Sequence, residues 1–395
     1  MTMKVRVLFV ATVLAATIWL VGCDHYNCSS GATFGASSCT TTSGGLGENG
    51  GGSGSISQTA FVYVVDNKHG GMSLLGLNVD ASGTFAPISS FVSPTLPVAP
   101  VASAGAVVVG ESFLYVPFSD GLLYGFSIDS GSGALTAVTN SPYSLPGGTA
   151  IAATPNGFLL FVGDPTGISS FTIGTNGSLS NSSHLSTTEP VSMTVDGLGR
   201  YLYTVDGASI NAFAINQTTG ALTSLGSFAT GSSIAYVTGE ASGNFILGVT
   251  NETGSNGISD NHIYVFSISS GALAQVNGSP FATVNPPTSL TVSPNGDFVY
   301  AFTETITTGA TFDPIEGYSI GSTGTLTSLG TVPDFLGEVG HFDQSGDYLF
   351  MVGSETNAPL AGVVPLTADP TSGGLSSTLP NTGAAGLTFA VTDVP

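Results

Sequence analysis

The chain has 395 residues, of which 42% are apolar and only 7% are charged, with 25 acids against four bases. A composition with many apolar and few charged residues disfavours a disordered chain. The 55 glycines favour many short strands joined by tight turns. Nucleic-acid binding is excluded because it needs a basic surface, and multiply anionic ligands are disfavoured because lysine and arginine usually hold them.

The N-terminal segment has the layout of a secretory signal. Two bases, Lys4 and Arg6, precede an apolar run from Val7 to Val21 that is short for a membrane span. The sequence LVGC, which ends at Cys23, resembles the bacterial lipoprotein box, and this resemblance implies cleavage before Cys23 and lipid on its sulfur. The alternative is an uncleaved membrane anchor. We predict a signal peptide over residues 1–22 and a lipid-anchored cell-envelope protein, on the periplasmic side or the cell surface.

A linker is predicted over residues 23–58. Its Gly/Ser-rich part is a flexible tether with no fold of its own. Cys28 and Cys39 lie within it, and outside the cytosol such a pair can form a disulfide, although two free thiols are the alternative.

Residues 59–395 contain a repeat with an aromatic residue at its centre. The copies recur about every 42 to 53 residues, which is the range of propeller blades. Most copies are followed by a turn and Gly-x-Leu. The clearest copies are LYGFSI (123–128), ISSFTI (168–173), INAFAI (210–215), IYVFSI (263–268) and IEGYSI (315–320). Their aromatic residues, Phe126, Phe171, Phe213, Phe266 and Tyr318, are expected to pack between blades.

Each period contains four expected strands, which gives seven blades. The body begins at a second strand (59–67) and ends on an unmatched inner-type strand (386–394). We therefore predict an all-β, seven-bladed β-propeller whose C-terminal strand completes the first blade and leaves no free edge. The body is expected to be monomeric.

Several segments resemble the lactonase family of seven-bladed propellers, which includes 6-phosphogluconolactonase and a muconate-lactonising enzyme. They are SPNGDFVY (293–300), SGALTAVTNSPY (132–143) and SGALAQVNGSPF (270–281). The resemblance covers roughly residues 59–395 and specifies the architecture more strongly than the activity.

The charged positions that the family uses for activity are largely replaced. The resemblance places Ser192 where the family has histidine, and Glu338 where it has arginine. The family's Pro-Arg-His becomes Ile234, Ala235 and Tyr236. Its Asn-Glu survives as Asn251-Glu252, with Glu304 at the equivalent place in the next blade. After removal of the signal, Lys68 and Arg200 are the only basic residues left, and Arg200 is expected on the opposite face.

Each blade also carries an acid near the end of its second strand. These acids are Asp66, Asp120, Asp164, Asp206, Glu252, Glu304 and Glu355, and Asp260 and Asp313 add to them. One interpretation is turn chemistry, because Asp-Gly pairs make good hairpin turns. The other is an acidic rim around the channel that attracts a cation, a cationic glycan or a basic protein surface. No calcium-loop motif is present, and no metal or other cofactor is expected.

No catalytic role is expected for the histidines of the propeller body. His341 lies on an expected inner strand and is expected in the core more than in the channel. His69, His184 and His262 lie on loops or strand starts.

Two functions follow from these observations. The preferred one is a non-catalytic binding or scaffold module, because the family's Arg and His are missing. The alternative is a divergent lactonase that hydrolyses an uncharged lactone with Glu252 or Glu304 as the base.

Overall fold

The structure is a computed structural model that describes residues 58–66, 73–80, 85–88, 96, 105–207, 209–230, 232–250, 260–303, 314–355, 362–376 and 388–393. The predicted signal peptide, Cys23, Cys28, Cys39 and almost all of the linker lie outside these residues. No helix within the described ranges is long and apolar enough to cross a membrane.

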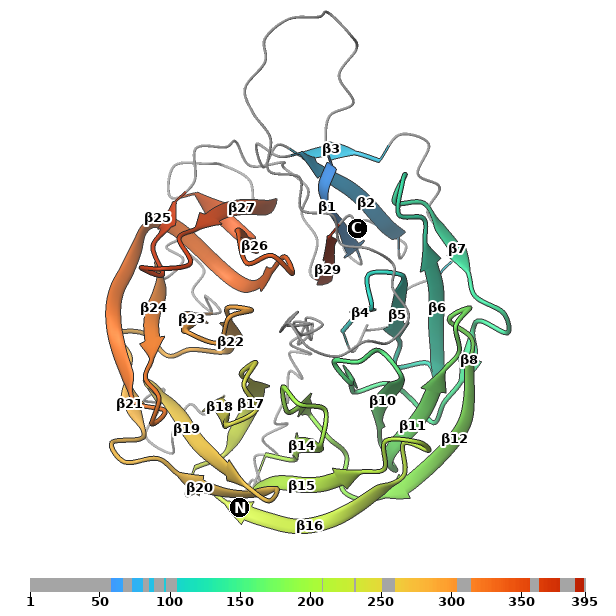
Figure 1. Ribbon diagram of the computed structural model, residues 1–395, viewed down its shortest axis with the longest axis horizontal. Helices are drawn as coiled ribbons and strands as arrows, with labels where there is room; N and C mark the ends of the chain where they lie inside the picture. The colour runs from blue at the N-terminus through green and yellow to red at the C-terminus, as the bar shows by residue number, and fades with distance from the viewer. Residues whose placement is uncertain are drawn as a thin grey trace, which may run out of the picture.

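The described chain is an all-β ring of antiparallel sheets, which Figure 1 shows down its axis. Blade 1 is built from β29 (Thr388–Asp393), β1 (Gln58–Asp66), β2 (Ser73–Asp80) and β3 (Phe85–Pro87). Blade 2 contains β4 (Val107–Val109), β5 (Phe113–Pro117), β6 (Leu122–Ile128), β7 (Leu135–Ala137) and the short β8 (Tyr143–Ser144). Blade 3 contains β9 (Ala150–Ala153), β10 (Leu159–Asp164), β11 (Gly167–Ile173) and β12 (Leu179–Ser186).

The remaining blades follow the same order from the axis outward. Blade 4 contains β13 (Ser192–Val195), β14 (Tyr201–Val205), β15 (Ser209–Ile215) and β16 (Leu222–Ala229). Blade 5 contains β17 (Ile234–Gly239), β18 (Phe245–Thr250), β19 (His262–Ser269), β20 (Ala272–Gln275) and β21 (Phe281–Ala282). Blades 6 and 7 share one sheet of β22 (Ser289–Val292), β23 (Phe298–Phe302), β24 (Pro314–Ile320), β25 (Leu326–Phe342), β26 (Tyr348–Glu355), β27 (Gly362–Ala368) and β28 (Leu375–Ser376).

The prediction of a seven-bladed propeller closed by its C-terminal strand is confirmed. β29 pairs antiparallel with β1, with Ala60 opposite Asp393 and Val65 opposite Thr388. In Figure 1 the dark red β29 lies beside the blue β1 on the inside of the ring. This pairing joins the two ends of the chain, so the first blade has its inner strand.

One strand differs from the sequence-based expectation. The outer strand of blade 6 and the inner strand of blade 7 were expected as separate elements, but β25 runs through both as 17 residues. It pairs with β24 at its start and with β26 at its end, with register shifts in each pairing. The chain therefore passes from one blade to the next as extended backbone.

The hydrophobic core consists of layers between neighbouring blades, one at each interface around the ring. The layer between blades 7 and 1, for example, joins Val62 and Val79 to Phe350 and Val363. The aromatic residues expected to fill these spaces are all buried: Phe126, Phe171, Phe213, Phe266 and Tyr318.

A tyrosine on a second strand is hydrogen-bonded to the next blade at four interfaces. The hydroxyl of Tyr203 donates to the carbonyl oxygen of Gly271 at 3.1 Å. The other pairs are Tyr63 with Gly133 at 2.8 Å, Tyr115 with Gly177 at 2.6 Å and Tyr300 with Gly373 at 2.8 Å. These tyrosines are buried, and burial raises their pKa values, so their hydroxyls keep the proton that they donate.

The acceptor glycine explains the Gly-x-Leu motif. Gly271 has φ of 84°, and a Cβ there would stand 2.3 Å from Leu225 and 2.9 Å from the Tyr201 ring of blade 4. Gly177 likewise has φ of 75°, and a Cβ atom added there would lie 2.4 Å from the Phe113 ring of blade 2. Only glycine combines this backbone conformation with so close an approach.

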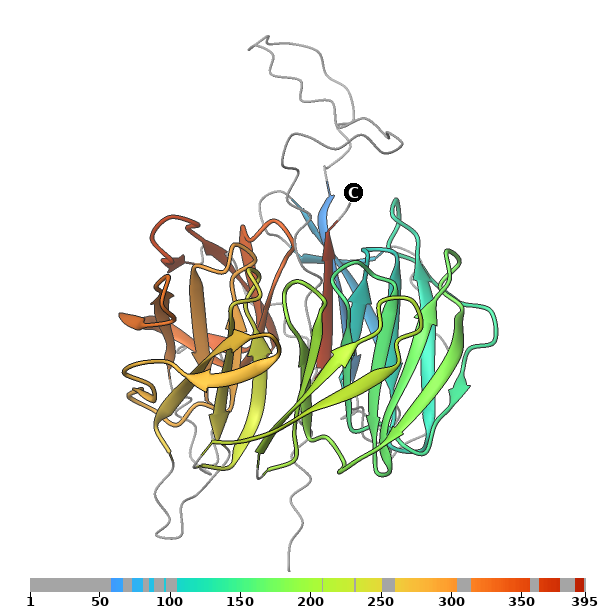
Figure 2. The same ribbon diagram turned by 60° about the horizontal axis from the view of Figure 1, so that its bottom comes forward.

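The two faces of the ring are defined by the ends of the strands. Inner strands begin where second strands end, as Ser192 pairs with Val205 and Ser289 with Phe302. We call this side the mouth face. The opposite side carries the turns between inner and second strands, such as residues 196–200, and the Gly-x-Leu turns; we call it the turn face. Figure 2 shows the ring turned by 60°, so that the blades are seen partly from the side.

We expect Tyr203→Phe to lower the free energy of unfolding by about 1–3 kcal/mol, because the buried carbonyl of Gly271 loses its donor. Urea unfolding measures this change. Tyr201→Phe is the matched control on the same strand and should stay within about 0.5 kcal/mol of the parent. Equal losses in both variants would contradict the hydrogen bond's role.

Deletion of residues 388–395 should leave β1 with an unpaired edge, because β29 supplies the hydrogen bonds from Ala60 to Val65. We expect a lower melting temperature together with aggregation in size-exclusion chromatography. A monomeric truncated protein with an unchanged melting temperature would contradict closure by this strand.

Candidate functional site

Acids on the mouth face cap the hairpins that they begin. Asp120 accepts the backbone N–H of Leu122 at 3.1 Å, and Asp164 accepts that of Thr166 at 2.8 Å. Asp206 accepts the N–H of Ser209 at 3.0 Å. Each carboxylate therefore satisfies a turn between a second and a third strand.

The same acids contact the second residue of the repeat in the third strand. Ser169 Oγ donates to Asp164 at 3.1 Å, and Asn211 Nδ2 donates to Asp206 at 3.1 Å. In blade 5 the Tyr264 hydroxyl donates to Asp260 at 2.7 Å. An acid and a polar partner thus recur at one position in blades 3, 4 and 5.

These contacts bear on the expected acidic rim. Asp164 has no solvent exposure, so its carboxylate does not contribute an exposed charge around the mouth, as the rim interpretation assumed. Asp120 and Asp206 act in turn capping, as the alternative interpretation expected. Glu252, Glu304 and Asp313 lie outside the described residues, as do the side chains of Asp66 and Glu355. The rim as a cation site stays a prediction.

A hydroxyl-bridged histidine lies on the mouth face of blade 3. His184 Nδ1 is 3.2 Å from Ser169 Oγ, and its Nε2 is 3.2 Å from Thr166 Oγ1. Both hydroxyls also donate to Asp164, at 3.1 and 2.5 Å. Each ring nitrogen faces a hydroxyl oxygen at 3.2 Å, so His184 is suited to holding the hairpin rather than to exchanging protons with a ligand.

A second histidine, in blade 5, is arranged differently. His262 Nδ1 is hydrogen-bonded to Asp260 Oδ1, while Asp260 Oδ2 accepts the Tyr264 hydroxyl. The Tyr264 oxygen is also 2.8 Å from Ser232 Oγ, in the segment that enters blade 5 from blade 4. The His262 side chain is 39% exposed. No role for His262 was predicted from the sequence, although Asp260, His262 and Tyr264 alternate and so share a face of the strand.

Positions that carry catalytic groups in the lactonase family hold structural side chains in this chain. Ser192 is fully buried, and its Oγ accepts the N–H of Val237 at 3.2 Å. Tyr236 is also buried, and its hydroxyl donates to the carbonyl of Leu290 at 2.6 Å. Both contacts join inner strands of adjacent blades. Glu338 falls in β25, but its side chain lies outside what the structure describes.

Two hydroxyls near the mouth face have no hydrogen-bond partner among the described residues. Thr149 Oγ1 lies just before the inner strand β9, and Thr250 Oγ1 lies at the end of the second strand β18. Both atoms are buried, and an unsatisfied buried hydroxyl costs free energy unless a ligand or water completes it.

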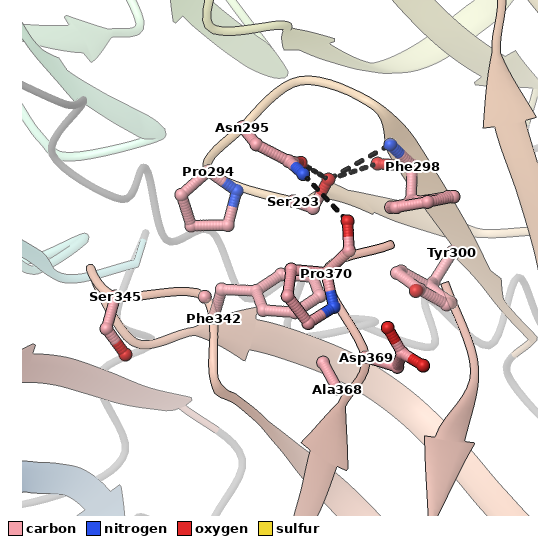
Figure 3. A pocket seen from close by; sticks show the side chains of 11 residues that line it. Ser293, Pro294, Asn295, Phe298, Tyr300, Phe342, Ser345, Ala368, Asp369 and Pro370 are labelled. Carbon is pink, nitrogen blue, oxygen red and sulfur yellow. Dashed lines mark hydrogen bonds between the residues drawn. The ribbon is translucent and has the colours of Figure 1, made fainter. Parts of the chain in front are cut away.

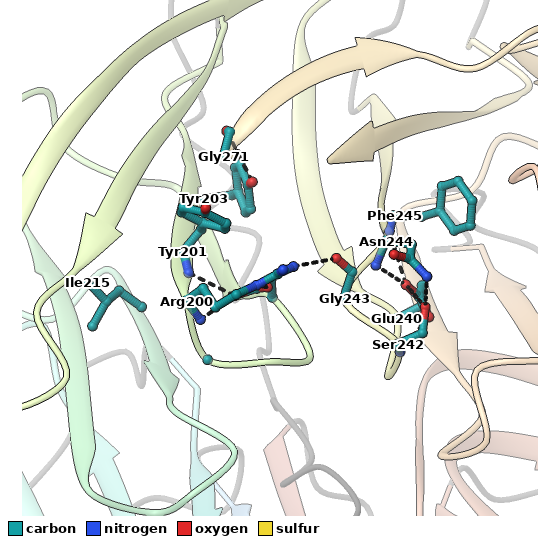
Figure 4. A network of polar contacts seen from close by, with 12 residues as sticks. Arg200, Tyr201, Tyr203, Ile215, Glu240, Ser242, Gly243, Asn244, Phe245 and Gly271 are labelled. Atoms are coloured by element: carbon teal, nitrogen blue, oxygen red, sulfur yellow. Dashed lines mark hydrogen bonds and ion pairs between the residues drawn. The ribbon is translucent and has the colours of Figure 1, made fainter. Parts of the chain in front are cut away.

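The only described Lys or Arg side chain lies on the turn face, as expected. Arg200 Nε is 2.8 Å from Asp196, and its guanidinium donates to the carbonyl of Gly243 at 2.8 Å. Figure 4 shows this link between blades 4 and 5 and the neighbouring Glu240, which accepts the N–H of Phe245 at 3.0 Å. Asp196 and Glu240 are therefore turn caps. Lys68 lies outside the described residues.

A small pocket of about 40 Å³ lies on the turn face between blades 6 and 7. Figure 3 shows its aromatic wall of Phe298, Tyr300 and Phe342, with Asp369 beside it. This space is on the opposite side of the ring from the mouth. Within the described ranges, no three His, Cys, Asp or Glu side chains come together to hold a metal ion.

His341 lies on the inner strand of blade 7 and is buried. Burial lowers the pKa of its imidazole to about 3, because the charged form is excluded from an apolar environment. It is therefore neutral at physiological pH, as expected for a core residue.

Comparison with known proteins supports the seven-bladed propeller fold. Residues 149–257 match the family model described as "Lactonase, 7-bladed beta-propeller". No curated protein sequence matches the chain.

Solved structures agree on the architecture. A putative 6-phosphogluconolactonase from Bacteroides uniformis has a TM-score of 0.64 at 17% identity, covering 86% of this chain and 98% of its own. One from Bacteroides fragilis has a TM-score of 0.65 at 17% identity with the same coverage. The periplasmic gluconolactonase of Pseudomonas aeruginosa has a TM-score of 0.63 at 15% identity, covering 86% of this chain and 100% of its own. At these identities the likeness shows the fold alone.

These findings correct the preferred function. The non-catalytic binding or scaffold module was chosen because the family's Arg and His are missing, but the family model that matches is a lactonase model. The alternative, a divergent lactonase, fits the findings better.

The buried imidazole predicts a measurable pH dependence. Unfolding returns the pKa of His341 from about 3 to about 6.5, so its contribution to stability is fully present above pH 6.5 and is lost as the pH falls toward 3. The free energy of unfolding of the parent, minus that of His341→Gln, should fall by up to about 1.4 kcal/mol per pH unit in this window. Urea unfolding from pH 7.5 to 4.5 measures it, and parallel curves would contradict a neutral buried His341.

Proposed function

From a seven-bladed β-propeller whose residues 149–257 match the lactonase family model, we propose that this protein is a lactonase that opens an uncharged lactone ring at its mouth face. The family match carries the proposal. The product is the corresponding hydroxy acid, and water is the nucleophile.

An uncharged substrate is supported by the distribution of charge. The described residues place no Lys or Arg on the mouth face, and the described Arg200 is engaged on the turn face. A phosphorylated sugar lactone needs cationic partners that replace its water of hydration. A neutral lactone presents only a carbonyl, a ring oxygen and hydroxyls, which neutral donors can bind.

The charge of the mouth face suits such a ligand. The turn-capping acids Asp120 and Asp206 add negative charge there, which repels phosphate and leaves a neutral ring unaffected.

The location of the protein in the cell follows from the N-terminal sequence, and we propose a lipid-anchored cell-envelope lactonase. The resemblance of LVGC to the lipoprotein box supports it. β1 begins beside the end of β29, on the turn face, so a tether that joins the body there leaves the mouth face free.

We predict hydrolysis of neutral lactones, with kcat/KM for δ-gluconolactone at least tenfold above that for its 6-phosphate. A pH-indicator assay on the purified protein measures both. Arg200→Gln, on the turn face, is the matched control and should leave both rates within about threefold.

Preference for the phosphorylated lactone would contradict the uncharged substrate. The absence of hydrolysis of any lactone in a panel of five- and six-membered rings would contradict the lactonase proposal as a whole.

A further inference from the structure

We infer that His262, oriented by Asp260, is the general base that activates water on the mouth face. The inference rests on the proposed lactonase function and assigns its proton-transfer group. It also replaces Glu252 and Glu304, the bases expected from the sequence, with a pair of side chains that the structure describes.

The two ring nitrogens of His262 are in different environments. Nδ1 is hydrogen-bonded to the Asp260 carboxylate, whereas Nε2 has no partner among the described residues. When Nδ1 carries the proton that it donates to Asp260, Nε2 is the unprotonated nitrogen. The side chain is 39% exposed, so the imidazole is in contact with solvent. An imidazole held in this tautomer is the arrangement that a general base requires.

The carboxylate is itself fixed in place. Asp260 is only 22% exposed, and its second oxygen accepts the Tyr264 hydroxyl at 2.7 Å. Tyr264 also contacts Ser232, which stands two residues before the inner strand β17. The pair is therefore tied both to its own strand and to the segment that leads to the axis of the ring. The neighbouring strand β21, opposite His262 at Ala282, adds no titratable group.

Comparison with blade 3 separates the two histidines of this face. His184 has hydroxyl oxygens 3.2 Å from both of its nitrogens, and its Nδ1 lies 3.6 Å from Asp164 Oδ2. His262 has a hydrogen bond to its carboxylate, and its Nε2 has no partner among the described residues. His184 is thus a natural control, since it shares the face and the residue type, while each of its nitrogens faces a hydroxyl.

The proposed reaction is hydrolysis of the lactone ring in two stages. In the first, Nε2 of His262 takes a proton from water while the water oxygen bonds to the lactone carbonyl carbon, which gives a tetrahedral oxyanion and an imidazolium. The oxyanion then re-forms the carbonyl as the ring C–O bond breaks. The leaving alkoxide takes the proton from Nε2, which regenerates neutral imidazole and releases the hydroxy acid. Asp260 stabilises the imidazolium and is not protonated.

The test is chemical rescue of a histidine variant in the full protein. On the best neutral lactone, His262→Ala should lower kcat by about 100-fold or more, and added imidazole should restore a measurable part of it. Asp260→Asn should lower kcat at least tenfold, because the amide no longer selects the tautomer. His184→Ala, on the same face, is the matched control and should stay within about threefold. His262→Gln provides a second variant, and melting temperatures verify folding.

The outcomes separate the inference from the function on which it rests. A wild-type protein that hydrolyses no lactone overturns the proposed function and the inference with it. An active wild type whose folded His262→Ala variant keeps more than a third of its activity, or loses activity that imidazole does not restore, overturns the inference alone. Glu252→Gln and Glu304→Gln, assayed in parallel, identify the base in that case.

Discussion

The contact between a second-strand tyrosine and the Gly-x-Leu turn of the next blade is the constraint on which this ring depends. It joins blades through a buried hydrogen bond, as from Tyr203 to Gly271, and requires a glycine with positive φ where the aromatic ring packs. At four interfaces among the described residues, such a contact fixes one blade against its neighbour. The closing pair of β1 and β29 then meets in register.

The same rigidity determines what the mouth face can do. Acids such as Asp164 and Asp206 hold hairpins, and Ser192 and Tyr236 hold inner strands together. These positions support the ring and leave few polar groups uncommitted. His262 is an exposed exception on the described part of this face, since one of its nitrogens is oriented by Asp260 and the other has no described partner. Chemistry at the mouth is therefore expected where blade 5 meets the segment from Ser232.

Much of the fold could be predicted from the sequence because its signals are local and repeated. The aromatic residue of each third strand and the Gly-x-Leu turn recur in every well-preserved blade, and the unmatched strand at residues 386–394 indicated closure. The continuous β25 was missed because Gly337 and Pro333 suggest a break, whereas pairing with β24 and β26 keeps the backbone extended.

The candidate site could be predicted only in part. The spacing of the acids along the sequence located the mouth face. The burial of Asp164 could not be predicted, because its carboxylate is hydrogen-bonded by Ser169 and Thr166 and no local sequence pattern specifies these contacts. The absence of Arg and His at the positions where the lactonase family has them favoured a non-catalytic module. The pairing of His262 with Asp260 had a signal in the sequence. Residues 260, 262 and 264 alternate, and a strand places the side chains of alternating residues on one face.

A crystal structure with a neutral lactam, in which nitrogen replaces the ring oxygen and slows hydrolysis, tests the central claim most directly. The account predicts the lactam on the mouth face of blade 5, with its carbonyl carbon within about 4 Å of a water molecule bound to His262 Nε2, close to the near-attack distance. A lactam bound only in the turn-face pocket between blades 6 and 7, or on the mouth face away from His262, would contradict it.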